Sequence, residues 1–372
     1  MFSTVFLLLI YHTNLLFSLQ NIRVADTKIL HDSKYIPASH LHRISTSAVD
    51  SLHDCVYLCH NNDYCRTANY YEFETDLLCA LFEENSYVGR IVSVSSIVSV
   101  VISFNLCPNG YSEPEFICFG LPKNIQPPIT IQNILTKLRL VQQWSVLTYY
   151  PIILSTRFYV PLFTTGILRI YEWPSLNYLY NITFPLSSYS FDMNLHGEYL
   201  LTSLSYDLYF YSTERNWTSD SSTYYPAVLS DRYIAVLSNG NSKIYIHNSI
   251  TGDSLFNLTI SSTVNWWARI INEQLYISST TGLRRIDLAQ GTSAVPVVLV
   301  ANLTCKQMFF DASGRIYLEK NDGTKVNSFV YDTNGRLLAS YTNGSRLIGK
   351  ASKYTFYLLN NLENPLLFYQ YP

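Results

Sequence analysis

The chain has 372 residues, more than one ordinary domain usually holds, so two folded units are expected. The formal net charge is −2 and only 25 residues are Lys or Arg, so nothing attracts a phosphate backbone or an anionic lipid surface, and nucleic acid is not an expected partner. Charged residues make up only 14%, whereas 31 Tyr and 19 Phe are present, and this composition favours strands over helices.

The N-terminus carries two apolar patches, residues 5–10 and 15–17, before the small residue Ser18. Together they have the length of the apolar core of a secretory signal, so we expect a signal peptide over 1–18, cleaved near Ser18, and a secreted protein. The alternative is a signal anchor that stays in the membrane. His12, Thr13 and Asn14 interrupt the apolar run, and a span needs roughly 20 apolar residues, so cleavage is favoured.

A second apolar run, IVSVSSIVSVVISFNL, covers residues 91–106. It is too short for a membrane span, and it consists mainly of serine and β-branched residues. The run therefore predicts one or two buried strands.

Six of the seven cysteines lie between positions 55 and 118, which is typical of disulfide-bonded domains in an oxidising compartment. Cys55 and Cys59 are four residues apart in segment 47–59, which predicts a helix with both sulfurs on one face, toward a neighbouring sheet. Segments 65–71 and 77–82 predict a hairpin in which each strand bears one cysteine.

The spacing C-x3-C-x5-C, then the aromatic pair 70–71, then Cys79 followed by Ala-Leu-Phe, resembles the PAN/apple family over residues 25–106. The resemblance implies an α+β module with one helix on an antiparallel sheet, tied by disulfides Cys55–Cys79 and Cys59–Cys65. Closing a loop of about 25 residues is worth on the order of 3 kcal/mol in the chain-entropy model. Apple domains proper carry a third bridge between the domain ends. No cysteine precedes Cys55 here, so the reduced PAN form is expected.

The remaining pair, Cys107 and Cys118, flanks the turn-prone sequence Pro-Asn-Gly-Tyr. We expect these two cysteines to form a disulfide that staples a connector over residues 107–123. An alternative interpretation of the cysteine-rich segment is a zinc site, because five potential ligands lie close together in the sequence: His53, Cys55, Cys59, His60 and Cys65. Their spacing does not follow the usual paired zinc knuckles and the cysteine count is even, so no metal or cofactor is expected.

From residue 124 to 372 the chain becomes a series of short apolar segments separated by turn residues. Similar units begin near residues 157, 198, 232, 273, 314 and 353, at intervals of 41, 34, 41, 41 and 39 residues. A period near 40 with several strands per unit predicts an all-β propeller of about six blades. Segment 129–148 supplies either a strand that closes the last blade or a seventh blade. Segments 311–317 and 331–338 resemble NHL/YncE-like propeller repeats. The alternative architecture is a β-sandwich or a solenoid.

No catalytic motif occurs: the sequence has no G-x-S-x-G, H-E-x-x-H, Walker loop or G-x-G-x-x-G. The repeat region holds only two histidines, His196 and His247. Six aspartates are candidates for general acids or calcium ligands at one rim, but each is more simply a turn residue: Asp192, Asp207, Asp231, Asp287, Asp311 and Asp332. We therefore expect no enzymatic activity.

If the protein is secreted, five sequons are candidate sites of N-glycosylation: Asn181, Asn216, Asn257, Asn302 and Asn343. Cys305, the odd cysteine, is expected to be a buried small apolar residue, with an intermolecular bridge as the alternative. The adjacent Trp266 and Trp267 are candidates for sugar stacking, although neighbours in a strand face opposite sides, so at least one belongs to a core.

The sequence thus predicts an extracellular, non-enzymatic recognition or adhesion protein that binds protein or carbohydrate ligands through its PAN module and propeller rim. Two other hypotheses stay open. One is a secreted propeller hydrolase or lyase. The other is a membrane-tethered surface receptor held by an uncleaved N-terminal anchor.

Overall fold

The computed structural model describes residues 26–38, 43–62, 65–84, 86, 88–95, 98–105, 116–117, 129–136, 139–144, 152–154, 157–162, 165–173, 175–184, 188–193, 199–203, 208–211, 216–219, 224–238, 242–262, 264–303, 305, 307–311, 313–321, 326–342, 345–352, 355–360 and 366–370. The expected signal peptide and the Cys107–Cys118 connector lie outside these residues. Within the described ranges, no helix has both the length and the apolar character needed to cross a membrane.

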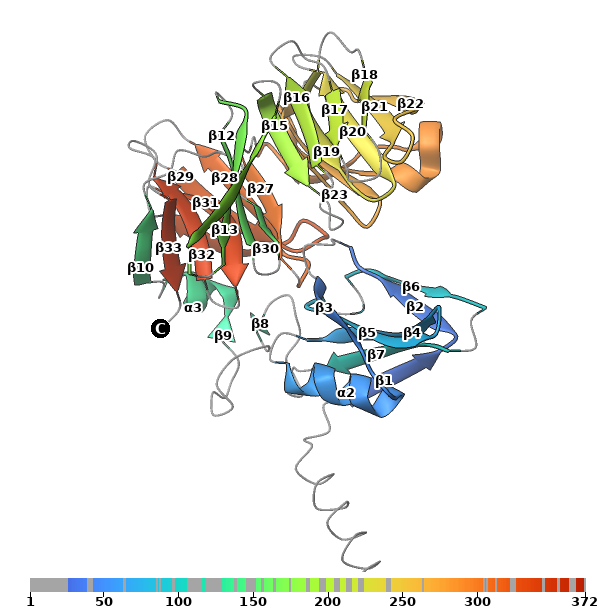
Figure 1. The fold of residues 1–372 in the computed structure, drawn as a ribbon. Helices are drawn as coiled ribbons and strands as arrows, with labels where there is room; N and C mark the ends of the chain where they lie inside the picture. Colours follow the sequence, from blue (N-terminus) through green and yellow to red (C-terminus); the bar gives the residue numbers. More distant parts are fainter. Residues whose placement is uncertain are drawn as a thin grey trace, which may run out of the picture.

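The N-terminal module is a five-stranded antiparallel sheet with one helix (Figure 1). Its strand order is β1 (Asp26–His31), β7 (Ser99–Asn105), β4 (Thr67–Phe73), β5 (Asp76–Phe82) and β3 (Arg43–Ala48). Helix α2 (Leu52–Asn61) packs on one face, and the ribbon of β2 (Ser33–Ile36) with β6 (Arg90–Ser93) packs through Tyr35 on the other. This is the helix-on-sheet arrangement that the PAN/apple resemblance implied.

Strand β5 shows how alternation builds two cores. Cys79 and Leu81 join the cluster beneath α2, whereas Ala80 and Phe82 join the opposite cluster around Tyr35. The rings of Tyr35 and Phe82 meet edge to face with centroids 5.3 Å apart. The central strands of the sheet are therefore buried on both sides.

Two predicted elements of this module need comment. In its described residues the apolar run 91–106 does form strands, β6 and β7. Residues 100–102 of β7 are buried as predicted, whereas the residues of β6 are half-buried or exposed. The helix predicted over 47–59 was wrong at its start: Ser47 and Ala48 close strand β3, paired with β5, and the helix begins at Leu52 after the capping residue Ser51. Cys65 precedes β4, so only one strand of the hairpin, β5, carries a cysteine.

The repeat domain contains six four-stranded antiparallel sheets among its described residues (Figure 1). The first comprises β11 (Ile152–Leu154), β12 (Arg157–Leu162), β13 (Ile167–Glu172) and β14 (Tyr178–Thr183). The second comprises β15 (Ser188–Met193), β16 (Tyr199–Ser203), β17 (Leu208–Tyr211) and β18 (Asn216–Ser219). The third comprises β19 (Tyr224–Leu229), β20 (Tyr233–Ser238), β21 (Lys243–Asn248) and β22 (Ser254–Thr259).

The later sheets follow the same order. The fourth comprises β23 (Val264–Ile271), β24 (Gln274–Ser279), β25 (Gly282–Asp287) and β26 (Val297–Ala301), with the 3₁₀ helix η2 (Leu288–Ser293) before β26. The fifth comprises β27 (Gln307–Phe310), β28 (Ile316–Asn321), β29 (Val326–Tyr331) and β30 (Leu337–Thr342). The sixth comprises β31 (Ser345–Ser352), β32 (Thr355–Asn360), β33 (Leu366–Gln370) and β10 (Arg139–Trp144).

Strand β10 settles the role of segment 129–148. It pairs antiparallel with β33, with Arg139 opposite Gln370, and so completes the sixth sheet instead of starting a seventh. The same segment contains the short strand β9 (Ile129–Thr130), which pairs with β8 (Phe116–Ile117), and the helix α3 (Ile131–Thr136). The first and last parts of the domain are thus held in one sheet, as in a closed propeller.

The sequence repeat and the sheets are offset by one strand. Four of the six predicted unit starts lie at or directly before the second strand of a sheet, as at Arg157 on β12 and Arg232 before β20. The other two, at 314 and 353, lie two residues before β28 and β32. Second strands carry the strongest pattern because they are central; β20 is buried at all six positions. The first strands β19 and β23 contain register shifts that blur their periodicity.

Apolar clusters lie between consecutive sheets. Leu237 and Ile246 of the third sheet pack against Leu275 and Ile286 of the fourth. The cluster between the fourth and fifth sheets contains Leu283, Cys305 and Ile316 among others. Each sheet is therefore packed face to face on the next, which is how propeller blades share their cores.

Candidate binding surface

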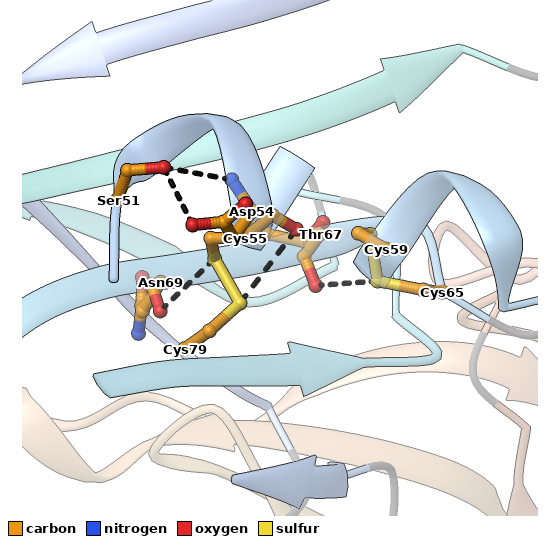
Figure 2. The surroundings of a disulfide bond; sticks show 8 residues. All are labelled: Ser51, Asp54, Cys55, Cys59, Cys65, Thr67, Asn69 and Cys79. Atoms are coloured by element: carbon orange, nitrogen blue, oxygen red, sulfur yellow. Dashed lines mark hydrogen bonds between the residues drawn. A yellow bond between two sulfur atoms is a disulfide. The ribbon is translucent and has the colours of Figure 1, made fainter. Parts of the chain in front are cut away.

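Helix α2 is fixed at its N-terminus by local capping (Figure 2). The backbone N–H of Asp54 donates to Ser51 Oγ at 3.2 Å, and Ser51 Oγ donates to Asp54 Oδ2 at 2.7 Å. Asp54 also places a negative charge in the first turn, where the helix dipole favours it, and His60 lies in the last turn. The cap that begins the helix is thus made by residues adjacent to it in the sequence.

Two disulfides hold the inner face of α2 to the sheet (Figure 2). The long bridge, Cys55–Cys79, ties the helix to β5 across 24 residues of sequence. The short bridge, Cys59–Cys65, ties the last turn to the start of β4 across 6 residues. These are the pairs that the PAN/apple resemblance implied. All four cysteines are at most 3% exposed, and their sulfurs are bonded to each other in pairs.

The outer face of α2 forms what we call the α2 stripe: His53, Tyr57 and Asn61, spaced four residues apart and all exposed. The Tyr57 side chain is 61% exposed, and the neighbouring Leu58 is 37% exposed. One face of the helix therefore carries the disulfides and packs in the core, and the other face exposes aromatic, imidazole and amide groups to solvent.

The module also contacts the repeat domain through named side chains. The guanidinium of Arg90, on β6, donates to both carboxylate oxygens of Glu273 at 3.0 and 3.3 Å. Arg232 donates to the same carboxylate at 3.3 Å and lies over the ring of Tyr233. Arg66 Nη1 donates to Ser313 Oγ at 3.2 Å in a buried setting.

The contact residues of the repeat domain share one structural position. Arg232, Glu273 and Ser313 lie in the turns that join the first and second strands of the third, fourth and fifth sheets. The backbone N–H of Asn272, in the same turn as Glu273, donates to the carbonyl of Ala38 at 3.1 Å. The module therefore sits on one face of the propeller. Sequence reasoning missed this surface because nothing local links residues about 180 positions apart.

The Asn272–Glu273 turn is held in an uncommon backbone conformation. Both residues have positive φ, 51° and 59°, as a two-residue hairpin turn requires. A side chain other than glycine costs roughly 1 kcal/mol there. At Glu273 that cost is offset by ion pairs to two arginines.

The aspartates considered as a rim cluster do not come together. Asp311 and Asp332 accept backbone hydrogen bonds in tight turns, and Asp287 caps η2. Asp192 is buried and accepts from the N–H groups of Leu229 and Met193, and burial raises the pKa of its carboxyl. Asp207 lies outside the described residues. No group of three or more metal-ligating side chains exists in the described part of the chain.

Two other residues of the repeat domain with reactive side chains, His247 and Cys305, are buried in the fold. His247 Nδ1 lies 3.2 Å from the carbonyl of Gly252, and burial lowers the pKa of its ring. His196 lies outside the described residues. Cys305 is buried beside Ser278, and burial raises the pKa of its thiol to about 11, so its predicted role as a small apolar residue fits its surroundings.

The predicted glycosylation residues and tryptophans are placed as follows. Asn181, Asn257 and Asn302 are exposed, and Asn216 is the first residue of β18. Asn343 lies outside the described residues. Trp267 is half-buried in β23; Trp266 is on the same strand, but its side chain is not described.

Comparison with known protein families identifies the N-terminal module. Residues 30–105 match the profile of the PAN domain family. The N-terminal module is therefore a PAN domain, and a disulfide-bonded PAN domain is typical of extracellular proteins. No curated protein matches the chain in sequence.

Among solved structures, the chain is similar to three propeller-type proteins. One is the Cps50 (Swd1) β-propeller domain of Myceliophteria thermophila, with TM-score 0.46, 7% identity, and coverage of 58% of this chain and 79% of that one. Another is the WD40 domain of Toxoplasma gondii coronin, with TM-score 0.42, 12% identity, and coverage of 58% and 67%. The third is BamB of Moraxella catarrhalis, with TM-score 0.37, 10% identity, and coverage of 63% and 99%.

Proposed function

We propose that this protein is secreted and acts in extracellular recognition or adhesion without catalysing a reaction. Its contact surfaces are the α2 stripe of the PAN domain and the rim of the propeller, and its ligands are proteins or carbohydrates. PAN domains and propellers are typical binding modules, and this fold-level argument supports the class of function.

The observation that carries the proposal is that the two faces of α2 differ: one is fixed to the sheet and the other is exposed. Two buried disulfides and the Ser51 cap fix the helix, while His53, Tyr57 and Asn61 remain in solvent. A rigid helix loses little conformational freedom when a ligand binds, so more of the contact energy becomes affinity. Tyrosine is a common anchor of interfaces because it combines a large ring with a hydroxyl.

The fixed placement of the PAN domain adds to this argument. Arg90 and Ala38 tie the domain to one turn of the fourth propeller sheet, and Arg66 ties it to the corresponding turn of the fifth. A ligand that meets both domains therefore meets surfaces already oriented toward each other, and avoids the cost of ordering a flexible linker.

Secretion is tested first, because every later claim depends on it. The full chain is expressed in a secreting eukaryotic host, and the medium is analysed by intact and peptide mass spectrometry with and without reduction. We expect protein that lacks about 18 residues. We also expect linked peptides for the long and short bridges. Cell-retained protein with an intact N-terminus would contradict secretion and favour the membrane-tethered receptor.

Ligand binding is tested with glycan arrays and a panel of extracellular proteins, using the full chain. For any ligand that binds, Tyr57→Ala is expected to weaken affinity about tenfold, the loss of one interface anchor. Phe73→Ala is the matched control, because Phe73 is also on the PAN domain and is 59% exposed. Equal effects of the two variants, or no effect of Tyr57→Ala, would remove the α2 stripe from the proposal.

A further inference from the structure

The four sequons within the described residues occupy one repeated place in the fold. Each belongs to the fourth strand of a different sheet or directly follows it. Asn181, Asn216 and Asn257 lie on β14, β18 and β22, and Asn302 follows β26. The fifth sequon, Asn343, comes after β30 in the sequence and lies outside the described residues. Chance placement would scatter them over the four strands and the loops of each repeat. Their common location is visible only once the strands are sorted into sheets.

The sequon asparagines of the first and third sheets also occupy the same register position relative to the neighbouring strand. Asn181 lies opposite Arg169, the third residue of β13, and Asn257 lies opposite Tyr245, the third residue of β21. In the fourth sheet the backbone N–H of Asn302 donates to the carbonyl of Thr281, which extends the pairing of β25 and β26 by one residue. Asn302 takes a positive φ of 58°, which asparagine tolerates better than most residues.

Strand alternation explains why these sites are exposed. In the sequence Asn257-Leu258-Thr259-Ile260, the Asn and Thr are exposed while the Leu and Ile are buried. The first sheet shows the same pattern, ending on buried Phe184. In the fourth sheet, the corresponding position is Cys305. The odd cysteine therefore stands where the first and third sheets place a buried apolar residue, Phe184 and Ile260.

The fourth strands are also the outer edges of their sheets, because each pairs with only one other strand. Seven of the nine exposed large apolar side chains described in the repeat domain lie on these strands: Tyr178, Leu179, Tyr180, Leu255, Val297, Val298 and Leu337. Exposed apolar edge strands are templates for pairing with another chain, so natural proteins usually cover or charge them.

We propose that N-linked glycans on Asn181, Asn216, Asn257 and Asn302 form a belt that covers the outer edges of four propeller sheets and keeps the protein monomeric. The inference rests on the proposed passage through the secretory pathway. The outer strand of the sixth sheet, β10, has no sequon.

The covalent step is a glycosyl transfer. The side-chain amide nitrogen of asparagine bonds to the anomeric carbon of a lipid-diphosphate-linked oligosaccharide. The carbon–oxygen bond to the diphosphate breaks, the lipid diphosphate leaves with the electron pair, and the amide proton passes to a base. The sugar is bulky and hydrophilic, which suits a surface strand and excludes a neighbouring chain.

Occupancy is measured on protein secreted from a eukaryotic host, by peptide mass spectrometry before and after treatment with peptide N-glycosidase. We expect glycan at Asn181 and Asn257, whose exposure and register match, and at Asn216 and Asn302. Thr259→Ser keeps the sequon and is expected to keep the glycan, whereas Thr259→Ala is expected to lose it. Secreted protein with bare Asn181 and Asn257 would overturn the belt.

The shielding role is measured by light scattering after size exclusion, on folded protein from which the glycans have been removed enzymatically. We expect the glycosylated chain to be a monomer and the deglycosylated chain to self-associate. Leu179→Lys with Tyr180→Lys, which charges the most apolar edge, is expected to reduce self-association of the deglycosylated chain. Deglycosylated protein that stays monomeric would overturn the shielding role.

These outcomes separate the belt from the proposed function. Protein that never leaves the cell refutes secretion and the belt together. Secreted protein with unmodified sequons refutes the belt alone and leaves extracellular recognition standing. Glycosylated protein that binds no ligand leaves the belt standing and contradicts the recognition proposal.

Discussion

Two turns of the fifth sheet share the sequence Asp-x-x-Gly-Arg but differ in burial, and they supply a matched test of buried charge. In residues 311–315, Asp311 Oδ1 accepts from the N–H groups of Ser313 and Arg315, and Oδ2 accepts from Arg315 Nη1 and the Tyr317 hydroxyl, both at 2.9 Å. In residues 332–336, the Asp332 carboxylate repeats the two backbone hydrogen bonds and the pairing with arginine.

The side chains of Asp311 and Arg315 are 0% and 2% exposed, whereas that of Arg336 is 57% exposed. Asp311→Asn keeps the oxygen that accepts from the backbone but leaves the Arg315 cation buried without its counter-charge, which costs about 3–5 kcal/mol. Asp332→Asn breaks a solvent-screened pair worth about 1 kcal/mol or less.

Differential scanning calorimetry of the full chain measures the difference. For a domain of this size, each kcal/mol corresponds to roughly 2–4 °C, so Asp311→Asn is expected to lower the melting temperature by about 10 °C and Asp332→Asn by at most about 3 °C. Replacing Arg315 by Met in the Asp311→Asn background is expected to recover part of the loss, because the buried cation is gone. Equal losses for the two Asp→Asn variants would refute the burial argument.

Three further predictions follow from the described contacts. Replacing both cysteines of the long bridge by alanine is expected to lower the free energy of unfolding by about 3.5 kcal/mol, against about 2.4 kcal/mol for the short bridge, because the long bridge closes the longer loop. Deuterium exchange of the α2 amides measures both losses, and a larger loss for the short bridge would contradict the chain-entropy reasoning. Cys305 is expected to resist alkylation at pH 8 in the folded protein. Because burial raises the pKa of its thiol to about 11, above the ordinary 9.0, its contribution to stability is full below pH 9 and is lost as pH rises toward 11. Cys305→Ala is expected to abolish that loss in alkaline unfolding curves. Glu273→Gln is expected to weaken the contact between the PAN domain and the propeller, so that the amides of β6 exchange with deuterium faster. Glu74→Gln, on the exposed β4–β5 turn, is the control and is expected to leave exchange at β6 unchanged.

Local signals in the sequence were sufficient for most of the PAN domain. Helix α2 follows from the spacing of Cys55 and Cys59 and from Ser51, whose hydroxyl caps the helix without help from distant residues. Its start was misjudged because residues 43–48 have no signal that separates a helix from an edge strand. Pairing with β5 makes that choice, and strand pairing is a contact between segments far apart in sequence.

The repeat of about 40 residues was also visible in the sequence, but its phase was not. Buried central strands such as β20 repeat clearly, whereas first strands with register shifts do not. The boundary of a sheet is a matter of which backbone groups pair. The pairing of β10 with β33 joins segments more than 200 residues apart, and no local pattern specifies it.

Composition, cysteine spacing and hydrophobic period predicted a disulfide-bonded module followed by a β-repeat domain, because each depends on residues close in sequence. The resemblance to the PAN/apple family supplied the identity of the module and its cysteine pairs. The tertiary structure alone decided three other features. It placed four sequons on or directly after equivalent outer strands, brought Glu273 against Arg90 and Arg232, and buried one of two identical Asp-x-x-Gly-Arg turns. Each of these depends on which sheet edges and turns become neighbours when the chain folds, and that is fixed by packing between distant segments.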